Sequence, residues 1–566
     1  MTSNQPTVVT AALPYANGDL HIGHVISTYI PADIYVRFLR LKGVDVVFVC
    51  GSDDHGTPIE IAALKSGTTP LRYADYYRAR HIEDFKALGI NFDNYHRTHS
   101  EENLELTNSF LLKAYENGYI YKREVEHFYC EKDRKFLPDR FVKGTCPYCG
   151  APDQYSDVCE RCGRVIEASK ILRPTCAICG STPRLRKAIH FFFKLSAFKD
   201  ALYTWLSQSS EDDFPKEVVN YVLSWIKAGL DDWDITREDY WGFKLPFKEA
   251  EEDQYAYVWV DAPIGYIAST VNYSKRTGVS WERYWRNSYA RIVHFIGKDI
   301  IYHHFIFWPA LLLAAGFHLP KKYVVNGYVT FEGEKLSKSR GWLIPVRYMT
   351  QRYPADYIRF YAALKSSNTI KDTDFSFKEF QERINGDLAD NIGNFAHRVL
   401  LFAYRFFNEE VPKPGEFNEE DLRFKEFIER LPNDVEKTYE LAIFSKSLEK
   451  ILTAFAEANR YLNLKEPWRK VKENVKEAGT TIYLALNFLR DGMIYLYPII
   501  PNISITVLGY LYDDVGKELT WSSTGKMMLK PGQRVKKPIP AVRKIANEEV
   551  EEDLKALKSG RFAVSV

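Results

Sequence analysis

The alternation of apolar and polar stretches near the start of the chain predicts a doubly wound α/β sheet. Two apolar runs, one starting at Thr7 and one over Val44–Cys50, each end in a polar loop that is followed by a helical stretch. This strand–helix–strand–helix order with continuously apolar strands indicates a parallel sheet covered on both faces. Such sheets bind ligands at the carboxyl ends of their strands, where both polar loops fall.

The second half of the chain has a different period. From about Phe375 to Tyr497 apolar residues recur every three or four positions, which predicts a bundle of long helices. Examples are Ile384, Leu388, Ile392 and Phe395, and later Leu441, Phe444, Leu448 and Leu452. The segment from Lys526 to Lys544 is basic and contains prolines, and Glu548–Asp553 is acidic, so we expect an extended arm and a short helix.

The length of the chain indicates that it folds into several structural units. A chain of 566 residues is too long for one core and should divide into about three or four units. The net charge of +2 neither requires nor excludes a nucleic-acid partner, because basic surfaces can be local. Met1–Pro6 leads directly into strand without a secretory leader, and no apolar run reaches membrane-spanning length. We therefore expect a soluble cytoplasmic protein that does not contact a membrane.

The first polar loop places two histidines on either side of a glycine. Pro14 and Asn17-Gly18 mark a turn, and His21-Ile22-Gly23-His24 opens the next helix. A helix N-terminus presents free backbone N–H groups, the imidazoles add side-chain donors, and Gly23 lets a base or ribose approach. The loop therefore suits a triphosphate, whereas the simpler interpretation is a pair of half-buried histidines at a helix start.

The second polar loop and a later aromatic segment are candidates for a small-molecule pocket. Asp53 and Asp54 follow the second strand, where a carboxylate could hold an ammonium group or could merely cap a helix. Trp259 and Tyr266 lie beside Ala262-Pro263, which we interpret as a turn that ends a strand. Large rings beside such a turn favour a pocket wall over a filled interior.

Six of the eight cysteines form Cys-x-x-Cys pairs, a spacing that indicates metal binding in an intracellular protein. Two pairs in close succession predict a structural zinc knuckle with four thiolates and no open position for water. These ligands are Cys146, Cys149, Cys159 and Cys162. A second zinc site would combine the third pair with an earlier cysteine and an aspartate, and its ligands would be Cys130, Asp133, Cys176 and Cys179.

Two further segments carry candidate chemistry. Gly333–Gly341 is a loop bounded by glycines in which lysines and serines offer cations and hydroxyls to phosphate, although alone it could be a solvated basic loop. In the helical region Asn394 and Arg398 share a helix face, and Trp468 follows Pro467 at the start of another helix. An exposed Trp near Asn and Arg would form a platform for unpaired bases, and an ordinary polar surface is the alternative.

Together these motifs resemble class I aminoacyl-tRNA synthetases, and within them the archaeal-type methionyl-tRNA synthetases, over nearly the whole chain. The two signature motifs are His21-Ile22-Gly23-His24 and Lys335-Leu336-Ser337-Lys338-Ser339, the second with Leu where the family usually has Met. More specific similarity lies in the cysteine-rich region and in Ala12–Gly18, Asp261–Tyr266 and Phe295–Asp299.

The resemblance implies a Rossmann-type doubly wound parallel sheet with an inserted zinc-knuckle domain, followed by an all-α helical-bundle anticodon-binding domain. The two halves of the catalytic domain would be residues 1–117 and 231–325, separated by a connective insertion at residues 118–230. Beyond them would follow the signature loop and stem-contact region at 326–385, the helical domain at 386–525, and the C-terminal arm and helix at 526–566.

The resemblance also implies residue roles. The catalytic residues would be His21, His24, Lys335 and Lys338, and ATP would also contact Gly23, Gly297 and Asp299. Asp53 would hold the α-ammonium group of methionine, and the side-chain pocket would consist of Leu13, Tyr15, Trp233, Trp259, Ala262, Pro263, Tyr266, Ile300 and His304. His303 stands where bacterial members carry Phe. The CAU anticodon would be read by Asn394, Arg398 and Trp468.

The implied reaction has two steps. Methionine attacks the α-phosphate of ATP, which is bound with Mg²⁺, and the resulting methionyl-adenylate is then attacked by the terminal adenosine of tRNA(Met), including the initiator tRNA. Phosphoryl transfer of this kind depends on positioning and charge stabilisation and needs no protein nucleophile. Because the chain has no C-terminal dimerising module, we expect a monomer, alone or with a separate tRNA-binding polypeptide.

Three other functions fit parts of the pattern. A class I synthetase for Ile, Leu or Val would need a long editing insertion, which the short cysteine-rich segment is not, and a Cys enzyme is a further alternative. A nucleotidyltransferase that makes a small cofactor would not need the helical domain. A non-catalytic RNA-binding protein with a decayed synthetase core would have no reason to retain His21, His24, Lys335 and Lys338.

Overall fold

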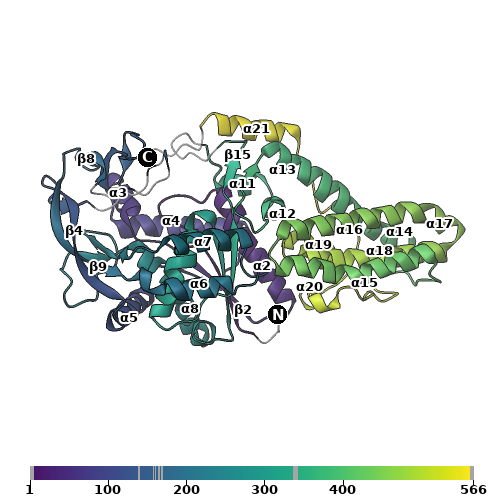
Figure 1. The fold of residues 1–566 in the computed structure, drawn as a ribbon. Coiled ribbons are helices and arrows are strands. Elements are labelled where there is room, and N and C mark those ends of the chain that lie inside the picture. The colour runs from purple at the N-terminus through teal and green to yellow at the C-terminus, as the bar shows by residue number, and fades with distance from the viewer. Residues whose placement is uncertain are drawn as a thin grey trace.

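A five-stranded parallel sheet forms the centre of the larger part of the molecule (Figure 1). The computed structural model describes residues 5–137, 141–156, 159, 161–162, 166, 170–334 and 342–560. The strand order is β14-β13-β1-β2-β3, and every neighbouring pair is parallel. The bounds are β1 Thr7–Ala11, β2 Val46–Ser52, β3 Asn94–Arg97, β13 Arg291–Gly297 and β14 Lys322–Asn326. The predicted doubly wound sheet is therefore confirmed.

The central strands are apolar on both faces because each face packs against its own core. On β1 the side chains of Val9 and Ala11 belong to one core and that of Val8 to the other. Successive side chains of a strand point to opposite faces, so only a continuous apolar run satisfies both. The first core includes α2 (Ile30–Leu41), α4 (Pro70–Ala87), α11 (Val346–Arg352) and α12 (Ala355–Lys365), and the second includes α5 (Glu101–Glu116), α8 (Val258–Thr277) and α10 (Trp308–Ala314).

The helix predicted after the first polar loop is present and ends where expected. It runs from α1 (Ile22–His24) through a π-helical turn at Val25–Tyr29 into α2, which ends at Leu41. After β2 the loop at residues 53–56 leads into α3 (Thr57–Lys65). Both polar loops thus lie at carboxyl ends of adjacent parallel strands, as the sequence pattern predicted.

One predicted turn is wrong. Ala262-Pro263 does not end a strand but lies inside α8, a helix of 20 residues. Proline removes one intrahelical hydrogen bond and usually marks a break. Here the residues from Val260 to Thr270 are all buried, so the helix is held by packing on every side rather than by local preference.

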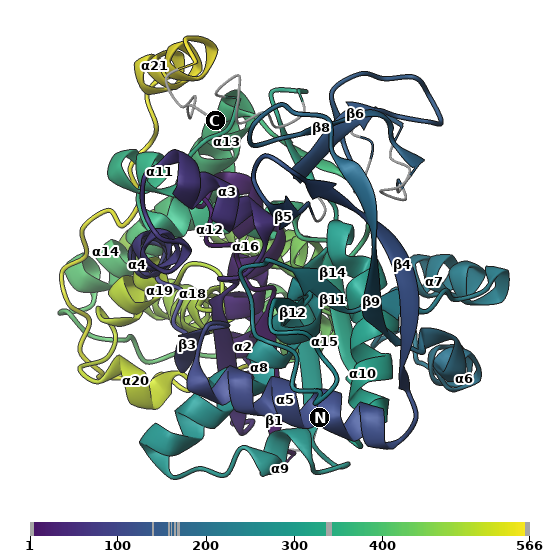
Figure 2. The same ribbon diagram turned by 90° about the vertical axis from the view of Figure 1, so that its left-hand side faces the viewer.

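An insertion built around a long antiparallel hairpin projects from the sheet (Figure 2). Strands β4 (Ile120–Cys130) and β9 (Arg184–Phe193) pair along most of their length within the sheet β10-β9-β4-β5. The other two members are β5 (Lys135–Phe136) and β10 (Trp233–Asp234). A small outer sheet β7-β6-β8 carries cysteines at its ends and consists of β6 (Val142–Thr145), β7 (Gln154–Tyr155) and β8 (Leu172–Cys176).

Short elements connect the insertion with the second half of the parallel sheet and lead on toward the helical region. The helices are α6 (Lys199–Ser207), α7 (Lys216–Ala228) and α9 (Glu282–Trp285). The strands are β11 (Thr236–Glu238), β12 (Gln254–Ala256), β15 (Val329–Phe331) and β16 (Thr373–Phe375). Strands β11 and β12 form one small antiparallel pair, and β15 and β16 form a parallel pair.

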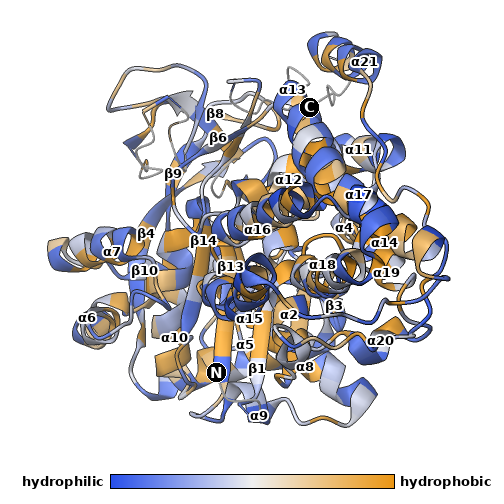
Figure 3. Ribbon diagram, turned by 90° about the vertical axis from the view of Figure 1, so that its right-hand side faces the viewer, coloured by the Kyte–Doolittle hydropathy of each residue, from blue (hydrophilic) through white to orange (hydrophobic). Residues whose placement is uncertain are grey.

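The predicted helical bundle occupies the other end of the molecule. Its elements are α13 (Phe377–Arg383), a π-helical segment at Ile384–Gly393, α14 (Asn394–Phe406), α15 (Glu419–Glu440), α16 (Phe444–Lys465), α17 (Pro467–Glu473), α18 (Val475–Leu496) and α19 (Pro501–Leu508). Figure 3 shows hydrophilic colours on the outward sides of α13 and α17 and hydrophobic colours on the central strands. The bundle shares one continuous core with the first face of the parallel sheet. Among the described residues, no helix is long and apolar enough to cross a membrane.

The C-terminal segment returns to the sheet-containing part of the molecule. After α20 (Val515–Glu518) an extended stretch leads to α21 (Asn547–Lys558), in agreement with the predicted arm and short helix. Asp553 on α21 is fully buried and accepts a hydrogen bond of 2.5 Å from the hydroxyl of Tyr348. The Nε of Arg352 lies 2.5 Å from the same carboxylate. These contacts fix α21 against α11.

Candidate functional site

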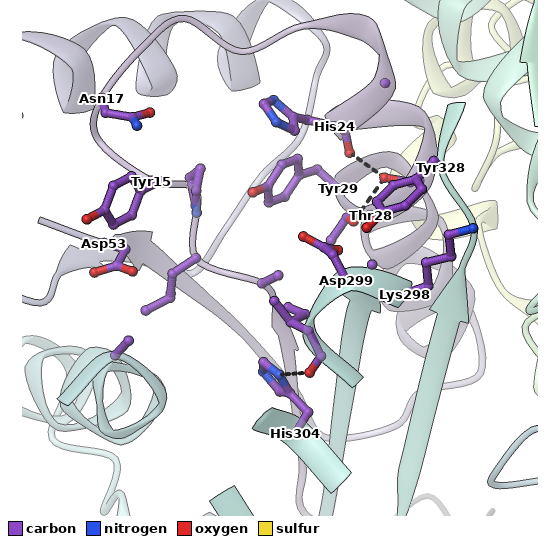
Figure 4. Close-up of a pocket in the computed structure, with 18 of the residues that line it drawn as sticks. Tyr15, Asn17, His24, Thr28, Tyr29, Asp53, Lys298, Asp299, His304 and Tyr328 are labelled. Carbon is purple, nitrogen blue, oxygen red and sulfur yellow. Dashed lines mark hydrogen bonds between the residues drawn. The ribbon is translucent and has the colours of Figure 1, made fainter. Parts of the chain in front are cut away.

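A cavity of about 960 Å³ opens at the carboxyl ends of β1, β2 and β13 (Figure 4). Its wall combines the first polar loop, the second polar loop, the start of α8 and the segment after β13. The predicted site residues that line it are Leu13, Tyr15, His21, Gly23, His24, Asp53, Trp259, Ala262, Pro263, Tyr266, Gly297, Asp299, Ile300 and His304. Leu13 and His304, which are 291 residues apart in sequence, thus line the same cavity.

The two signature histidines lie together at one end of this cavity. Their rings stack with centroids 3.5 Å apart, and the backbone N–H of His21 donates to Nδ1 of His24 at 3.4 Å. At Gly23 an added Cβ would lie 3.1 Å from Nδ1 of His21, so a larger residue would have to displace that ring. Glycine at this position therefore allows the His21 ring to pack against the backbone at the edge of the cavity.

The segment that follows the second signature motif is bonded to the first. The N–H of Ile22 donates to the carbonyl of Ile344 at 2.8 Å, and the N–H of Val346 donates to the carbonyl of Leu20 at 3.0 Å. Lys335 and Lys338 themselves lie outside the described residues. On the other flank, the N–H of Gly333 donates to Asp374 at 2.9 Å. Both flanks of the motif are thus anchored, one of them on the backbone that carries His21.

Asp53 places an unpartnered carboxylate oxygen in the cavity wall. Two backbone hydrogen bonds of 2.9 Å hold Asp53 against the first loop. The N–H of Asp53 donates to the carbonyl of Pro14, and the N–H of Ala16 donates to the carbonyl of Asp53. The side chain is buried, and Oδ1 has no hydrogen-bond partner among the described residues. Burial, and then the neighbouring carboxylates of Asp261 and Asp54, raise the pKa of Asp53 well above its ordinary value. Such a group is satisfied by a ligand that brings a positive charge.

The opposite wall is aromatic and carries neutral imidazoles. The Nδ1–H of His304 donates to the carbonyl of Ile300 at 3.1 Å, which leaves Nε2 to accept from the hydroxyl of Tyr266 at 2.9 Å. Burial lowers the pKa of His304 to about 4. The ring of Trp259 stacks on that of His303 with centroids 3.6 Å apart. This wall suits an apolar, polarizable group rather than a charged one.

One predicted pocket residue does not line the cavity. Trp233 lies behind its wall, where its ring contacts Phe307 at a centroid distance of 3.9 Å and His303 at 5.4 Å. It therefore supports a ring that stacks on Trp259.

Several other residues line the cavity although the sequence did not predict them as site residues. Among them are Thr28, Tyr240, Tyr257, Val258, Lys298 and Tyr328. A usable signal existed for Tyr328, because Gly327-Tyr328 follows β14 as the polar loops follow β1 and β2. Lys298 is paired with Asp372 at 2.5 Å, and its ammonium lies 4.5 Å from the ring centroid of Tyr328.

The structure brings each predicted set of metal ligands together. One ligand atom from each of Cys146, Cys149, Cys159 and Cys162 lies within 4.8 Å of the others. The same holds for Cys130, Asp133, Cys176 and Cys179. The Sγ atoms of Cys146 and Cys162 are 3.9 Å apart, and those of Cys149 and Cys159 are 3.6 Å apart. Each cluster could therefore hold a metal ion.

The three predicted base-reading residues lie at the far end of the helical bundle. Asn394 and Arg398 are one turn apart on α14, and Trp468 is at the start of α17. The guanidinium carbon of Arg398 lies 5.4 Å from the centroid of the Trp468 ring, which is 40% exposed. The side-chain amide of Asn394 donates to Asp390 at 3.1 Å. An exposed ring beside a guanidinium is thus present, and the amide of Asn394 lies one helical turn from Arg398.

Known proteins share this architecture. The profile described as "tRNA synthetases class I (M)" matches residues 7–400, and the profile "Anticodon binding domain of methionyl tRNA ligase" matches residues 411–561. The methionine–tRNA ligase of Pyrococcus furiosus is 40% identical over 558 residues, which cover 96% of this chain and 76% of the relative. That of Methanobrevibacter smithii is 39% identical over 550 residues, or 97% and 82% of the two chains.

A solved structure shows the same arrangement. The crystal structure of Mycobacterium tuberculosis methionyl-tRNA synthetase bound by methionyl-adenylate has a TM-score of 0.79 and 26% identity, and the match covers 95% of this chain and 100% of that one. Parallel sheet, carboxyl-edge cavity and helical bundle thus define a class I tRNA synthetase architecture. Within this class, the match to the anticodon-binding domain of methionyl tRNA ligase and the two relatives identify one family. The chain belongs to the methionyl-tRNA ligase family.

Proposed function

We propose that the protein is a methionine–tRNA ligase that activates methionine with ATP and transfers it to the 3'-terminal adenosine of tRNA(Met). The observation that carries this proposal is a single cavity with an unpartnered buried carboxylate and an aromatic wall at one end and the two signature histidines at the other. An amino acid with an apolar side chain and a nucleoside triphosphate fit these two ends.

In the first step a carboxylate oxygen of methionine attacks the α-phosphorus of ATP, and the bond to the leaving pyrophosphate breaks. His21 and His24 would donate to the phosphates, and Lys335 with Lys338 would neutralise the pyrophosphate. Gly297 and Asp299 would contact the nucleotide, and Mg²⁺ would enter with ATP. Because the chemistry depends on alignment and charge, the residues act by positioning and electrostatic stabilisation.

In the second step a ribose hydroxyl of the terminal adenosine attacks the carbonyl carbon of the adenylate, and AMP leaves with the bonding electron pair. The anticodon would meet Asn394, Arg398 and Trp468 at the far end of the helical bundle. Base stacking on the exposed indole and hydrogen bonds from the guanidinium and amide would discriminate the CAU triplet. We propose that a monomer carries out both steps, alone or with a separate tRNA-binding polypeptide.

The cysteine clusters would hold structural zinc. Tetrahedral Zn²⁺ with bonds of about 2.3 Å to thiolate sulfur requires neighbouring sulfur atoms roughly 3.8 Å apart. The observed separations of 3.9 and 3.6 Å in the Cys146–Cys162 cluster fit this value. In the second cluster Asp133 would replace one thiolate, since its Oδ2 lies 3.1 Å from the sulfur of Cys130 and 3.0 Å from that of Cys176. In both clusters four protein ligands would fill the coordination shell of the ion, so no open position would remain for water or substrate.

The test is ATP–pyrophosphate exchange measured with each standard amino acid in turn. Exchange with methionine alone, followed by charging of tRNA(Met), is expected. Exchange driven by Cys, Ile, Leu or Val would indicate a synthetase for another amino acid. Exchange without any amino acid would indicate a nucleotidyltransferase, and the absence of exchange would indicate a non-catalytic binding protein. Each of these results would contradict the proposal.

A further inference from the structure

A third group of metal-binding side chains lies outside the cavity and outside both cysteine clusters. It consists of His127 on β4, His190 on β9 and Asp234 on β10, with Glu238 of β11 beside it. One ligand atom of each of His127, His190 and Asp234 lies within 4.8 Å of the others. Strands β4 and β9, which carry the two histidines, form the stem of the insertion (Figure 2), and β10 pairs with β9 at the edge of the same sheet.

The strand register places the three ligand side chains on one face of the sheet. His190 is opposite Arg123 of β4, and His127 lies an even number of residues further along that strand. Asp234 is opposite Phe192, two residues from His190. Since every second residue of a strand faces the same side, all three side chains lie on one face, where their ligand atoms come within 4.8 Å of one another.

His190 is held between two carboxylates. Its Nδ1 lies 2.7 Å from Oδ2 of Asp234, and its Nε2 contacts the carboxylate of Glu238. A neutral imidazole has only one N–H and can donate to only one of them. When Nε2 donates to the buried carboxylate of Glu238, the short contact between Nδ1 and Asp234 needs a cation between the two atoms, which is either a second proton on the ring or a metal ion. His127 adds Nε2 at 3.9 Å from the same oxygen of Asp234.

We propose that this cluster is a binding site for a divalent transition-metal ion of the Zn²⁺ type. The ligands are Nε2 of His127, Nδ1 of His190 and Oδ2 of Asp234, and water completes the shell. Two imidazoles and a carboxylate form a donor set that such ions prefer. The carboxylate of Glu238 on the second nitrogen is the partner that usually orients a ligating histidine.

Two further observations support a site rather than an ordinary ion pair. Glu238 is only 2% exposed, yet its Oε2 has no hydrogen-bond partner among the described residues, so the cluster carries more negative charge than its hydrogen bonds satisfy. The side chains of His127 and Asp234 are 18% and 22% exposed, which leaves a path for an ion from solvent.

The position suggests what the ion does. Asp234 follows Trp233, whose ring supports His303 behind the aromatic wall of the cavity. An ion shared by β4, β9 and β10 would fasten the insertion to the strand that carries this indole. The site is therefore structural, and it couples the insertion to the cavity wall.

The experiment uses full-length protein that is saturated with Zn²⁺ at the cysteine clusters and then passed over a weak chelator. Calorimetric titration with Zn²⁺ should reveal one additional equivalent with micromolar affinity. H127Q and D234N should each weaken this equivalent at least tenfold, and E238Q should weaken it about 10- to 100-fold, as loss of an orienting carboxylate does. H127Q changes a partly exposed side chain and is the variant that tests the site if D234N fails to fold.

The matched control is H96Q. His96 also contacts a carboxylate, Glu102 at 3.2 Å, but it belongs to none of the clusters that could hold a metal among the described residues. This variant should bind the additional equivalent like the wild type. Wild-type protein that takes up no additional Zn²⁺ at about 100 μM, or uptake that is unchanged in H127Q, would show that the cluster is an ion-pair network held by protons.

Discussion

The strongest test of the cavity is the substitution Asp53→Asn. This change keeps the shape of the side chain and removes its negative charge. In the proposed complex the ammonium group of methionine would neutralise a carboxylate that has no other partner on Oδ1. The variant should therefore fail to bind methionine well while ATP binding stays nearly unchanged.

The magnitude follows from the burial of Asp53, which is 9% exposed. Removing one partner of a buried ion pair costs about 3–5 kcal/mol, which corresponds to a loss of roughly 100- to 5,000-fold. The ammonium contact exists before and during the chemical step, so the loss should appear mainly as a higher KM for methionine. Methioninol, which keeps the ammonium group and lacks the carboxylate, should lose binding by a similar factor.

The same substitution should stabilise the free protein. The pKa of Asp53 is raised in the folded state by burial and then by Asp261 and Asp54. Between the unfolded pKa and this higher value the folded state binds more protons, so ionisation of Asp53 lowers stability as pH rises. At neutral pH Asp53→Asn removes that penalty, and the Tm without ligand should increase.

Steady-state pyrophosphate exchange and thermal unfolding provide both measurements. For the wild type, kcat/KM for methionine should fall as pH decreases through the raised pKa of Asp53, and Asp53→Asn should lack this dependence. A variant that loses Tm together with activity would refute the reasoning, because Asp53 would then be a structural residue. So would a KM for methionine that stays within a factor of three of the wild type.

Three other variants test separate parts of the molecule. Lys338→Ala should slow adenylate formation by orders of magnitude with methionine binding nearly intact, and exchange at the wild-type rate would contradict the proposed role. Trp468→Ala should weaken tRNA charging without changing exchange, whereas equal losses in both assays would identify a core residue. Asp33→Asn leaves the buried guanidinium of Arg359, 2.7 Å away, without its charge partner and should lower the free energy of unfolding by about 3–5 kcal/mol in urea. The exposed pair of Asp390 and Lys544 provides the control, since Asp390→Asn should cost at most about 1 kcal/mol.

Features encoded by local spacing could be predicted from the sequence, and features created by packing could not. The metal ligands could be predicted because two cysteines separated by two residues form a local sequence pattern that binds one ion. The structure brings both sets of ligands together. The helix across Pro263 was missed because burial on all sides overrides local preference, and the apolar pattern does not distinguish the π-helical turn at Val25–Tyr29 from ordinary α-helix. His127 and Asp234 are more than a hundred residues apart, so only strand register could reveal that they share a face.

The position of Gly56 explains why the two polar loops form one site rather than two. Its φ of 106° is a conformation that favours glycine, and an added Cβ would lie 2.2 Å from the hydroxyl of Tyr15. Because this space is empty, that hydroxyl can donate to the carbonyl of His55 at 2.5 Å. The neighbours of Tyr15 in the first loop, Pro14 and Ala16, form the backbone hydrogen bonds to Asp53.

A displacement of the first loop would therefore move Asp53 and the histidines together. The helix that begins at Ile22 is bonded in turn to Ile344, which follows the second signature motif. The proposed methionine end and the proposed phosphate end of the cavity are thus parts of one hydrogen-bonded framework. In-line attack requires the carboxylate and the α-phosphate to be aligned within a fraction of an ångström, and such a framework can hold both substrates in that alignment without a group that reacts covalently.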